Sequence, residues 1–196
     1  MAEERRCIAD LIGDIDEAQL ATASLCTGWD VKTVGAHLVS LLAGGTRTVM
    51  RLGLTGNSAR AIDQLARRGA QLPAAEIAAS LRQLADHTYW RPPPRAPGLL
   101  AEVLCHSGDI RIPLGLPFEP EPELTATVLD FLTGPVPLRR LRGIRLYADD
   151  IDRTWRDGLE VRGRAADLMM AAVGRASALD SLDGPGLSLL RQRISR

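Results

Sequence analysis

Three side chains of this sequence could hold a metal ion together. His37 lies in the run from Val34 to Leu41, where apolar residues recur at helical spacing, so its imidazole is expected to face the interior. Glu102 and His106 are one helical turn apart in a second apolar run, and a carboxylate is rarely buried without a partner. Two imidazole nitrogens and one carboxylate oxygen suit Zn²⁺, with a fourth position open to water or substrate. Nickel, iron and manganese accept the same ligands.

The residue pattern alone leaves two ordinary alternatives open. Glu102 and His106 could form an ion pair on a helix surface, because opposite charges four residues apart commonly do so. His37 could be a core histidine whose ring nitrogens are hydrogen-bonded inside the protein. Spacing by itself therefore does not decide between a metal site and these structural roles.

Two further residues are candidates for contacts around such a site. Asp109 follows His106 by three residues on the same helical face and could accept the ring N–H of a ligating histidine. A helix C-terminal cap or an ion pair with Arg111 is the alternative for Asp109. Arg175 could bind a substrate carboxylate through paired hydrogen bonds, or it could form a surface or interdomain ion pair.

Other reactive residue types are expected to have structural roles. Cys26 precedes the start of a helix, which could activate its thiol, but no basic partner is near in sequence. We therefore expect Cys26 to serve packing or turn geometry, and Cys105 to be a small core residue. Trp29 is expected to pack near a helix end, without a catalytic role.

Four long helices are expected to position these residues. Apolar residues recur at helical spacing in each, Asp30 stands where an N-cap would be, and the prolines at 92–94 and 97 separate the third helix from the fourth. The expected ranges are 4–22, 30–53, 73–90 and 98–112, with one or two further helical turns in 60–70.

A smaller segment of mixed structure is expected after these helices. Residues 124–132 have a helical pattern, and the run Gly134-Pro135-Val136-Pro137 is typical of a boundary. Residues 143–148 alternate as a strand does, 153–156 could be its hairpin partner, Asp157-Gly158 is a turn signal, and a helix is expected over 165–174. We therefore predict a mainly α protein, with a helical bundle over 1–135 and a small α+β C-terminal domain over 136–196.

Composition restricts the class of protein and its partners. Of 196 residues, 45% are hydrophobic, which is enough to build a core. The formal net charge is zero, so there is no basic field to attract a nucleic acid. The longest apolar run is too short to span a membrane, and three irregularly spaced cysteines indicate reduced thiols. These features predict a cytoplasmic protein without nucleic-acid or membrane partners.

Three stretches resemble one known family. SLCTGWDVKTVGAHLVSLL, LLAEVLCHSGDIRIPLG and GIRLYADDIDRTWRDGLEVRGRAADLMMAAVGR are similar to segments of the mycothiol-dependent maleylpyruvate isomerase family, within the wider DinB-like proteins. The resemblance implies a DinB-like four-helix bundle followed by a small C-terminal domain. It also implies a divalent metal, usually zinc, on His37, Glu102 and His106, and the actinobacterial thiol mycothiol as cosubstrate. In some DinB-like proteins a further histidine completes the site, which makes His87 a candidate.

The resemblance also implies a reaction. A metal with one open position can bind a thiol, stabilise its thiolate and present it as a nucleophile to a small electrophilic substrate. The chain would then be a metal-dependent isomerase of the maleylpyruvate type or an S-transferase, acting as a monomer or homodimer. The alternative is a metal-binding or regulatory module that keeps the fold without turnover.

Overall fold

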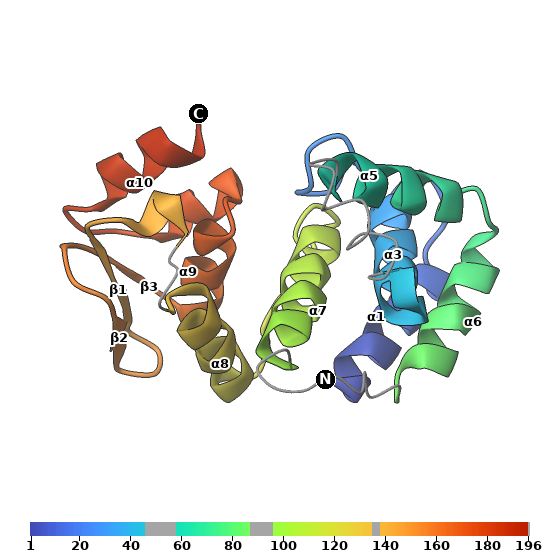
Figure 1. Ribbon diagram of the computed structural model, residues 1–196, viewed down its shortest axis with the longest axis horizontal. Coiled ribbons are helices and arrows are strands. Elements are labelled where there is room, and N and C mark those ends of the chain that lie inside the picture. The colour runs from blue at the N-terminus through green and yellow to red at the C-terminus, as the bar shows by residue number, and fades with distance from the viewer. Residues whose placement is uncertain (46–57, 87–95, 135–137, 196) are drawn as a thin grey trace. The chain divides into compact units, whose positions relative to one another are not determined.

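The computed structural model describes residues 1–45, 58–86, 96–134 and 138–195, and most of them are helical (Figure 1). The mainly α fold class with a small C-terminal sheet is confirmed. Among the described residues, no helix combines the length and the apolar character needed to cross a membrane.

The chain forms two compact units. Unit 1 contains Met1–Pro92 and His106–Pro117, and unit 2 contains Pro93–Cys105 and Phe118–Arg196. The division falls inside one helix, α7 (Ala96–Arg111), which is continuous across it. The domain boundary expected between residues 135 and 136 stays a prediction, and residues 135–137 lie outside the described residues.

The N-terminal part of unit 1 contains two helices where one was expected. Helix α1 (Ala2–Asp14) ends before the predicted limit at residue 22. Asp16 then starts a separate short helix, α2 (Glu17–Leu20): its side chain accepts a hydrogen bond from the backbone N–H of Gln19, and its own backbone N–H donates to the side-chain oxygen of Gln19. Because this capping box satisfies the free amides of a new helix, it interrupts the old one.

Helix α3 (Val31–Ser40) begins as the sequence predicts. The carboxylate of Asp30 accepts a hydrogen bond from the backbone N–H of Thr33 at 2.7 Å and caps the helix. After Ser40 the chain continues as a π-helical turn, η1 (Leu41–Gly45), and the remainder of the range predicted to residue 53 lies outside the described residues.

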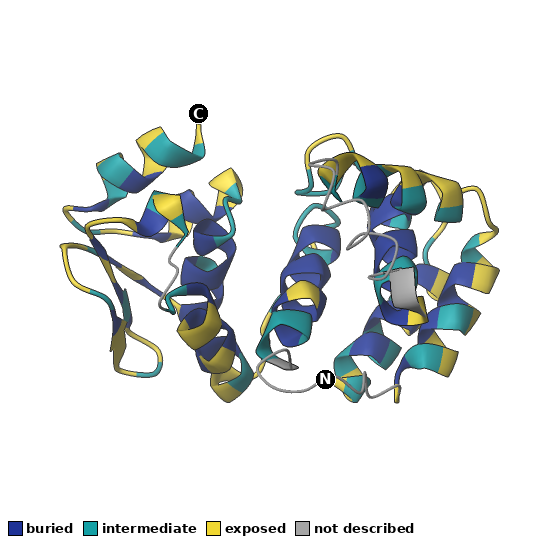
Figure 2. Cartoon of the chain, in the orientation of Figure 1, coloured by how far each residue is buried: buried dark blue, intermediate teal, exposed yellow. Residues whose placement is uncertain are grey.

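Two further helices pack around α1 and α3. Helix α5 (Ser58–Gly69) lies across α3 and is a full helix rather than one or two turns, and α6 (Ala74–Leu84) packs against α1 and α3 (Figure 1). Figure 2 shows most residues of α3 as buried, whereas most residues of α5 are exposed or half-buried. Gly35 lets α3 approach α1, because a Cβ atom at this position would be 3.1 Å from Ile12.

The second half of α7 belongs to unit 1 and is fastened to it by hydrogen bonds. Ser107, which is fully buried, donates its hydroxyl to Glu4 of α1 at 2.5 Å. The backbone N–H of Leu25 donates to the carbonyl oxygen of Asp109 at 3.3 Å. These contacts fix the part of α7 that carries His106.

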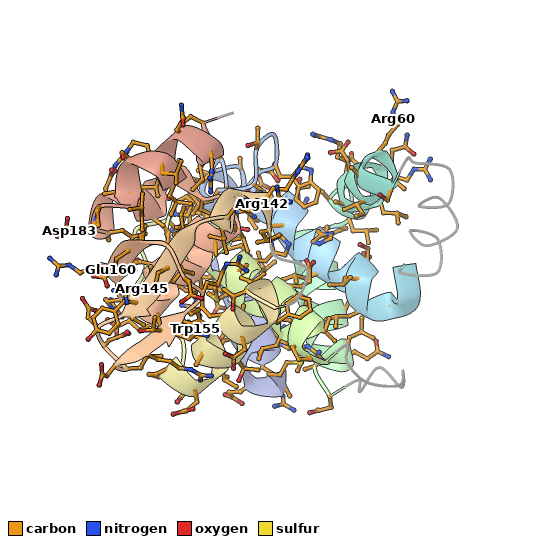
Figure 3. The ribbon with its side chains drawn as sticks, turned by 60° about the vertical axis from the view of Figure 1, so that its left-hand side comes forward. Arg60, Arg142, Arg145, Trp155, Glu160 and Asp183 are labelled. Atoms are coloured by element: carbon orange, nitrogen blue, oxygen red, sulfur yellow. The ribbon has the colours of Figure 1, made fainter. Side chains whose placement is uncertain are left out.

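Unit 2 contains the small sheet and its helices. Strand β1 (Ile144–Ala148) pairs antiparallel with β2 (Arg153–Trp155), which confirms the predicted hairpin, and parallel with β3 (Leu159–Gly163), which was not predicted. Figure 3 labels Arg145 and Glu160, which form an ion pair between β1 and β3. The other elements of unit 2 are α8 (Pro122–Leu132), which packs on α9 (Ala165–Ala172), the 3₁₀ turns η2 (Arg139–Leu141) and η3 (Ala176–Ser181), and α10 (Leu187–Ile194).

Candidate metal centre

His37 takes its position from α3. The helix begins at the Asp30 cap and presents six consecutive buried residues after Lys32, including His37, which is only 6% exposed. Its ring lies against the ring of His106 from α7, with centroids 4.9 Å apart and an edge-to-face angle of 80°. The two predicted histidine ligands are therefore neighbours in the interior.

The ring of Trp29 also lies against the ring of His37. Their ring centroids are 5.1 Å apart and tilted by 46°. The indole N–H of Trp29 donates to Asp63 at 2.8 Å, and Arg67 donates to the same carboxylate at 2.9 Å. These two donors, the indole first, lower the pKa of Asp63. Sequence reasoning expected only packing for Trp29 and did not foresee the ring contact with His37.

Glu102 stands one turn before His106 on the same continuous helix. One oxygen of Glu102 and one ring nitrogen from each of His37 and His106 all lie within 4.8 Å of one another. The expectation that Glu102 is buried with His106 is wrong, because Glu102 is exposed while His106 is 8% exposed. The carboxylate thus lies at the solvent side of the three residues, and the histidines lie inside.

Asp109 lies one turn after His106 and is fully buried. Its Oδ2 atom is 2.8 Å from Nδ1 of His106. We assign the proton to Nδ1, because an ionised carboxylate can only accept a hydrogen bond. In this tautomer, Nε2 is the nitrogen of His106 that carries a lone pair for a metal.

Cys26 is the residue whose place the sequence did not reveal. Its Sγ atom is 3.0 Å from Oδ2 of Asp109 and 3.6 Å from Nδ1 of His106. Cys26 is more than 75 residues away in sequence from both partners, so no local pattern could have indicated the contact. The only available signal was its position three residues before Trp29, in the first stretch that resembles the family.

Two groups of side chains in the described residues have the composition of a metal site, and they share His106. With bonds of about 2.1 Å, the ligand atoms of a tetrahedral zinc site are about 3.4 Å apart. In the group Cys26, His106 and Asp109, the contacts of 2.8 and 3.0 Å to Asp109 are shorter and match hydrogen bonds. The group His37, Glu102 and His106 has the N,N,O donor set of a zinc site and one ligand open to solvent, so these residues fit a divalent metal.

The sequence identifies the family of this site. The model of the family described as mycothiol maleylpyruvate isomerase N-terminal domain matches residues 1–110, which is more than half of the chain and includes His37, Glu102 and His106. The chain belongs to this family. As a member of the mycothiol maleylpyruvate isomerase family, it carries the three residues in the part of the chain that defines the family.

Two solved structures have a similar fold. A crystal structure of mycothiol-dependent maleylpyruvate isomerase superposes with a TM-score of 0.56 at 19% sequence identity, covering 94% of this chain and 93% of that one. A mutant of the isomerase gives a TM-score of 0.52 at 19% identity, with the same coverage of both chains. Among curated protein sequences, no significant match is found.

Two other candidates from the sequence of this member of the mycothiol maleylpyruvate isomerase family are Arg175 and His87. Arg175 is half-buried at the start of η3 in unit 2, close enough to Arg140 to lower its pKa, although burial of Arg140 lowers it more. His87, the candidate additional ligand, lies outside the described residues.

Proposed function

We propose that this chain is a metal-dependent, mycothiol-using isomerase or S-transferase that acts on a small electrophilic substrate. His37, Glu102 and His106 hold a divalent metal, zinc by its donor preference, and Asp109 orients His106. The observation that carries the proposal is the convergence of two buried histidines and one exposed carboxylate within 4.8 Å. Family membership supports mycothiol as the thiol.

Different residues of the chain would hold the metal and leave access for the substrates. When bound, the metal supplies Lewis acidity that favours the thiolate form of a coordinated thiol at neutral pH. His37 and His106 bind it from the interior, where Trp29 and Asp109 fix their rings. Glu102 binds from the solvent side, so the cosubstrate and substrate enter next to Glu102. No protein nucleophile is needed, because the thiol is the nucleophile.

Arg175 is assigned to a carboxylate of the substrate. Two neighbouring guanidinium groups, Arg140 and Arg175, produce a positive potential that favours a carboxylate ligand. Replacing Arg175 by Gln is expected to raise KM for a carboxylate substrate without changing the amount of bound metal. An unchanged KM would refute this assignment.

Metal content tests the site. Wild-type protein and the His37→Ala, Glu102→Ala and Glu76→Ala variants are purified without a metal-chelating tag, and bound metal per chain is determined by elemental mass spectrometry. Wild type and Glu76→Ala, which changes another exposed helical glutamate, are expected to carry about one equivalent. The two ligand variants are expected to lose it. Wild type that neither contains metal nor takes up added zinc would refute the proposal.

Measuring the concentration of free mycothiol during turnover distinguishes isomerisation from S-transfer. Isomerisation adds the thiol to a double bond and then releases it, so free mycothiol stays constant while maleylpyruvate is converted. S-transfer forms a carbon–sulfur bond that persists, so one thiol is consumed per substrate. A zinc-loaded protein that does neither with a panel of small electrophiles would instead be the non-catalytic metal-binding module.

A further inference from the structure

Cys26 lies in a short loop whose backbone is held by its own hydrogen bonds. The backbone N–H of Ser24 donates to Trp29 at 3.0 Å, and the N–H of Trp29 donates back to Cys26 at 3.0 Å. The backbone N–H of Cys26 donates to the hydroxyl of Ser24 at 3.1 Å. The backbone position of Cys26 is therefore fixed by hydrogen bonds within the loop, independently of the contacts that its side chain makes.

Two hydrogen bonds attach the loop to Asp109 of α7. Next to Cys26, the backbone N–H of Leu25 donates to the carbonyl oxygen of Asp109. The thiol of Cys26 donates to the side-chain Oδ2 of the same residue at 3.0 Å. That oxygen is also the acceptor for Nδ1–H of His106 at 2.8 Å. Main chain and side chain of Asp109 are thus both bonded to the Cys26 loop.

This arrangement makes the carboxylate of Asp109 a relay between Cys26 and His106. A fully buried carboxylate is stabilised by each hydrogen-bond donor that points at it. Two donors on one oxygen also restrict rotation of the carboxylate, and its direction sets the direction of the imidazole that donates to it. A sulfur at this place contributes a donor with little hydration to lose.

We propose that Cys26 is a positioning residue of the metal centre. Its S–H holds Oδ2 of Asp109 in line with Nδ1–H of His106, and this keeps Nε2 of His106 directed at the metal. The inference rests on the proposed function, because it concerns the metal held by His37, Glu102 and His106. It gives the cysteine a role as a hydrogen-bond donor, neither as a nucleophile nor as a metal ligand.

Zinc affinity of the full-length protein, measured by competition with a chromophoric chelator, tests the proposal. Cys26→Ala is expected to bind zinc about tenfold more weakly, at the low end of the effect of an outer-sphere partner. Cys26→Ser keeps a donor and is expected to restore the affinity to within about twofold of wild type. Cys7→Ala, which changes a half-buried cysteine of α1, is the matched control and should bind like wild type. A merely structural role of Cys26 would lower the melting temperature of the metal-free protein and leave zinc affinity unchanged, which would overturn the proposal.

A double-mutant cycle tests the route through the carboxylate. If Cys26 acts through Asp109, then Cys26→Ala has no further effect on zinc affinity in an Asp109→Ala background, which removes the acceptor oxygen that the two residues share. A further tenfold loss in that background would overturn the proposal. If Cys26→Ala does not fold, Cys26→Val takes its place in the cycle, because it fills the same space without a donor.

The cobalt-substituted protein distinguishes a donor from a ligand. A thiolate-to-cobalt charge-transfer band that disappears in Cys26→Ser would make the cysteine a ligand and overturn the positioning role. Its absence in wild type is the expected result. Wild type that binds neither zinc nor cobalt would refute the proposed function itself, whereas equal affinities of wild type and Cys26→Ala would refute only this inference.

Discussion

Replacing Trp29 by Leu should weaken metal binding by a calculable amount. The ring of Trp29 lies 5.1 Å from the ring of His37 at a tilt of 46°, which is within the range of favourable aromatic pairs. Such a pair contributes about 0.5–1.5 kcal/mol beyond the burial of its area. If this energy holds His37 in its metal-binding orientation, its loss corresponds to about a 2- to 12-fold weaker zinc affinity, at about 1.4 kcal/mol per factor of ten.

The chain offers a matched control for this substitution. Trp155 in β2 also donates its indole N–H to an aspartate, Asp130, at 2.8 Å, as Trp29 does to Asp63. Trp155→Leu should therefore lower the stability of unit 2 without changing zinc affinity. Trp29→Phe keeps an aromatic ring against His37 and should retain most of the affinity while losing the bond to Asp63.

Zinc affinity is measured by chelator competition for wild type, Trp29→Leu, Trp29→Phe and Trp155→Leu. The reasoning is refuted if Trp29→Leu binds zinc as tightly as wild type, or if Trp155→Leu weakens binding to the same extent. The first result would mean that His37 keeps its orientation without the indole. The second would mean that general destabilisation, and not the ring contact, controls the affinity.

Three other substitutions test separate parts of the structure. Asp109→Asn should weaken zinc binding about 10- to 100-fold in the same competition assay, because the amide orients His106 poorly. Gly158→Ala should lower the free energy of unfolding in urea by about 1–3 kcal/mol, since the glycine has φ +134° and an added Cβ would lie 2.2 Å from the backbone of Gly143; an unchanged midpoint would contradict the strain. Asp63→Asn tests a pH effect: the folded-state pKa of Asp63 is lowered, so its contribution is present above the unfolded pKa of about 3.9 and is lost as pH falls through the folded value. The melting temperatures of Asp63→Asn and wild type should therefore differ at pH 6, and the difference should shrink as the pH falls below about 4; a difference that stays constant down to low pH would count against the charge effect.

The local features of the fold could be predicted from sequence where a local cause exists. Asp30 caps α3, the prolines at 92–94 precede α7 while Pro97 lies in its first turn, and the alternation in 143–148 gives β1 with its hairpin partner. The break at Asp16 was missed because its capping box lies inside an uninterrupted apolar pattern. Strand β3 was missed because it pairs parallel with β1, although β2 lies between them in sequence. A parallel pair has no tight hairpin turn that could be recognised in the sequence.

The candidate site divides in the same way. The spacing of Glu102, His106 and Asp109 on one helix is a local property, so their common face could be predicted. The exposure of Glu102 could not, because it depends on which neighbouring elements cover that turn of α7. The contacts of Cys26 with Asp109 and of Trp29 with His37 bring together separate elements, and only the folded chain shows them.

If the proposed site binds a metal, the place of its second histidine, on α7 near the middle of the chain, determines when a newly made molecule can bind it. His37 leaves the ribosome 69 residues before His106, and at about 5–20 residues per second this interval lasts about 3–14 s. During this time α1, α3 and α6 can form, whereas His106 and Asp109 of α7, which lie next to His37 and Cys26 in the folded chain, have not yet been made. On the proposed function, the complete set of ligands exists only after α7 has been made, so the metal cannot nucleate the helices that precede α7.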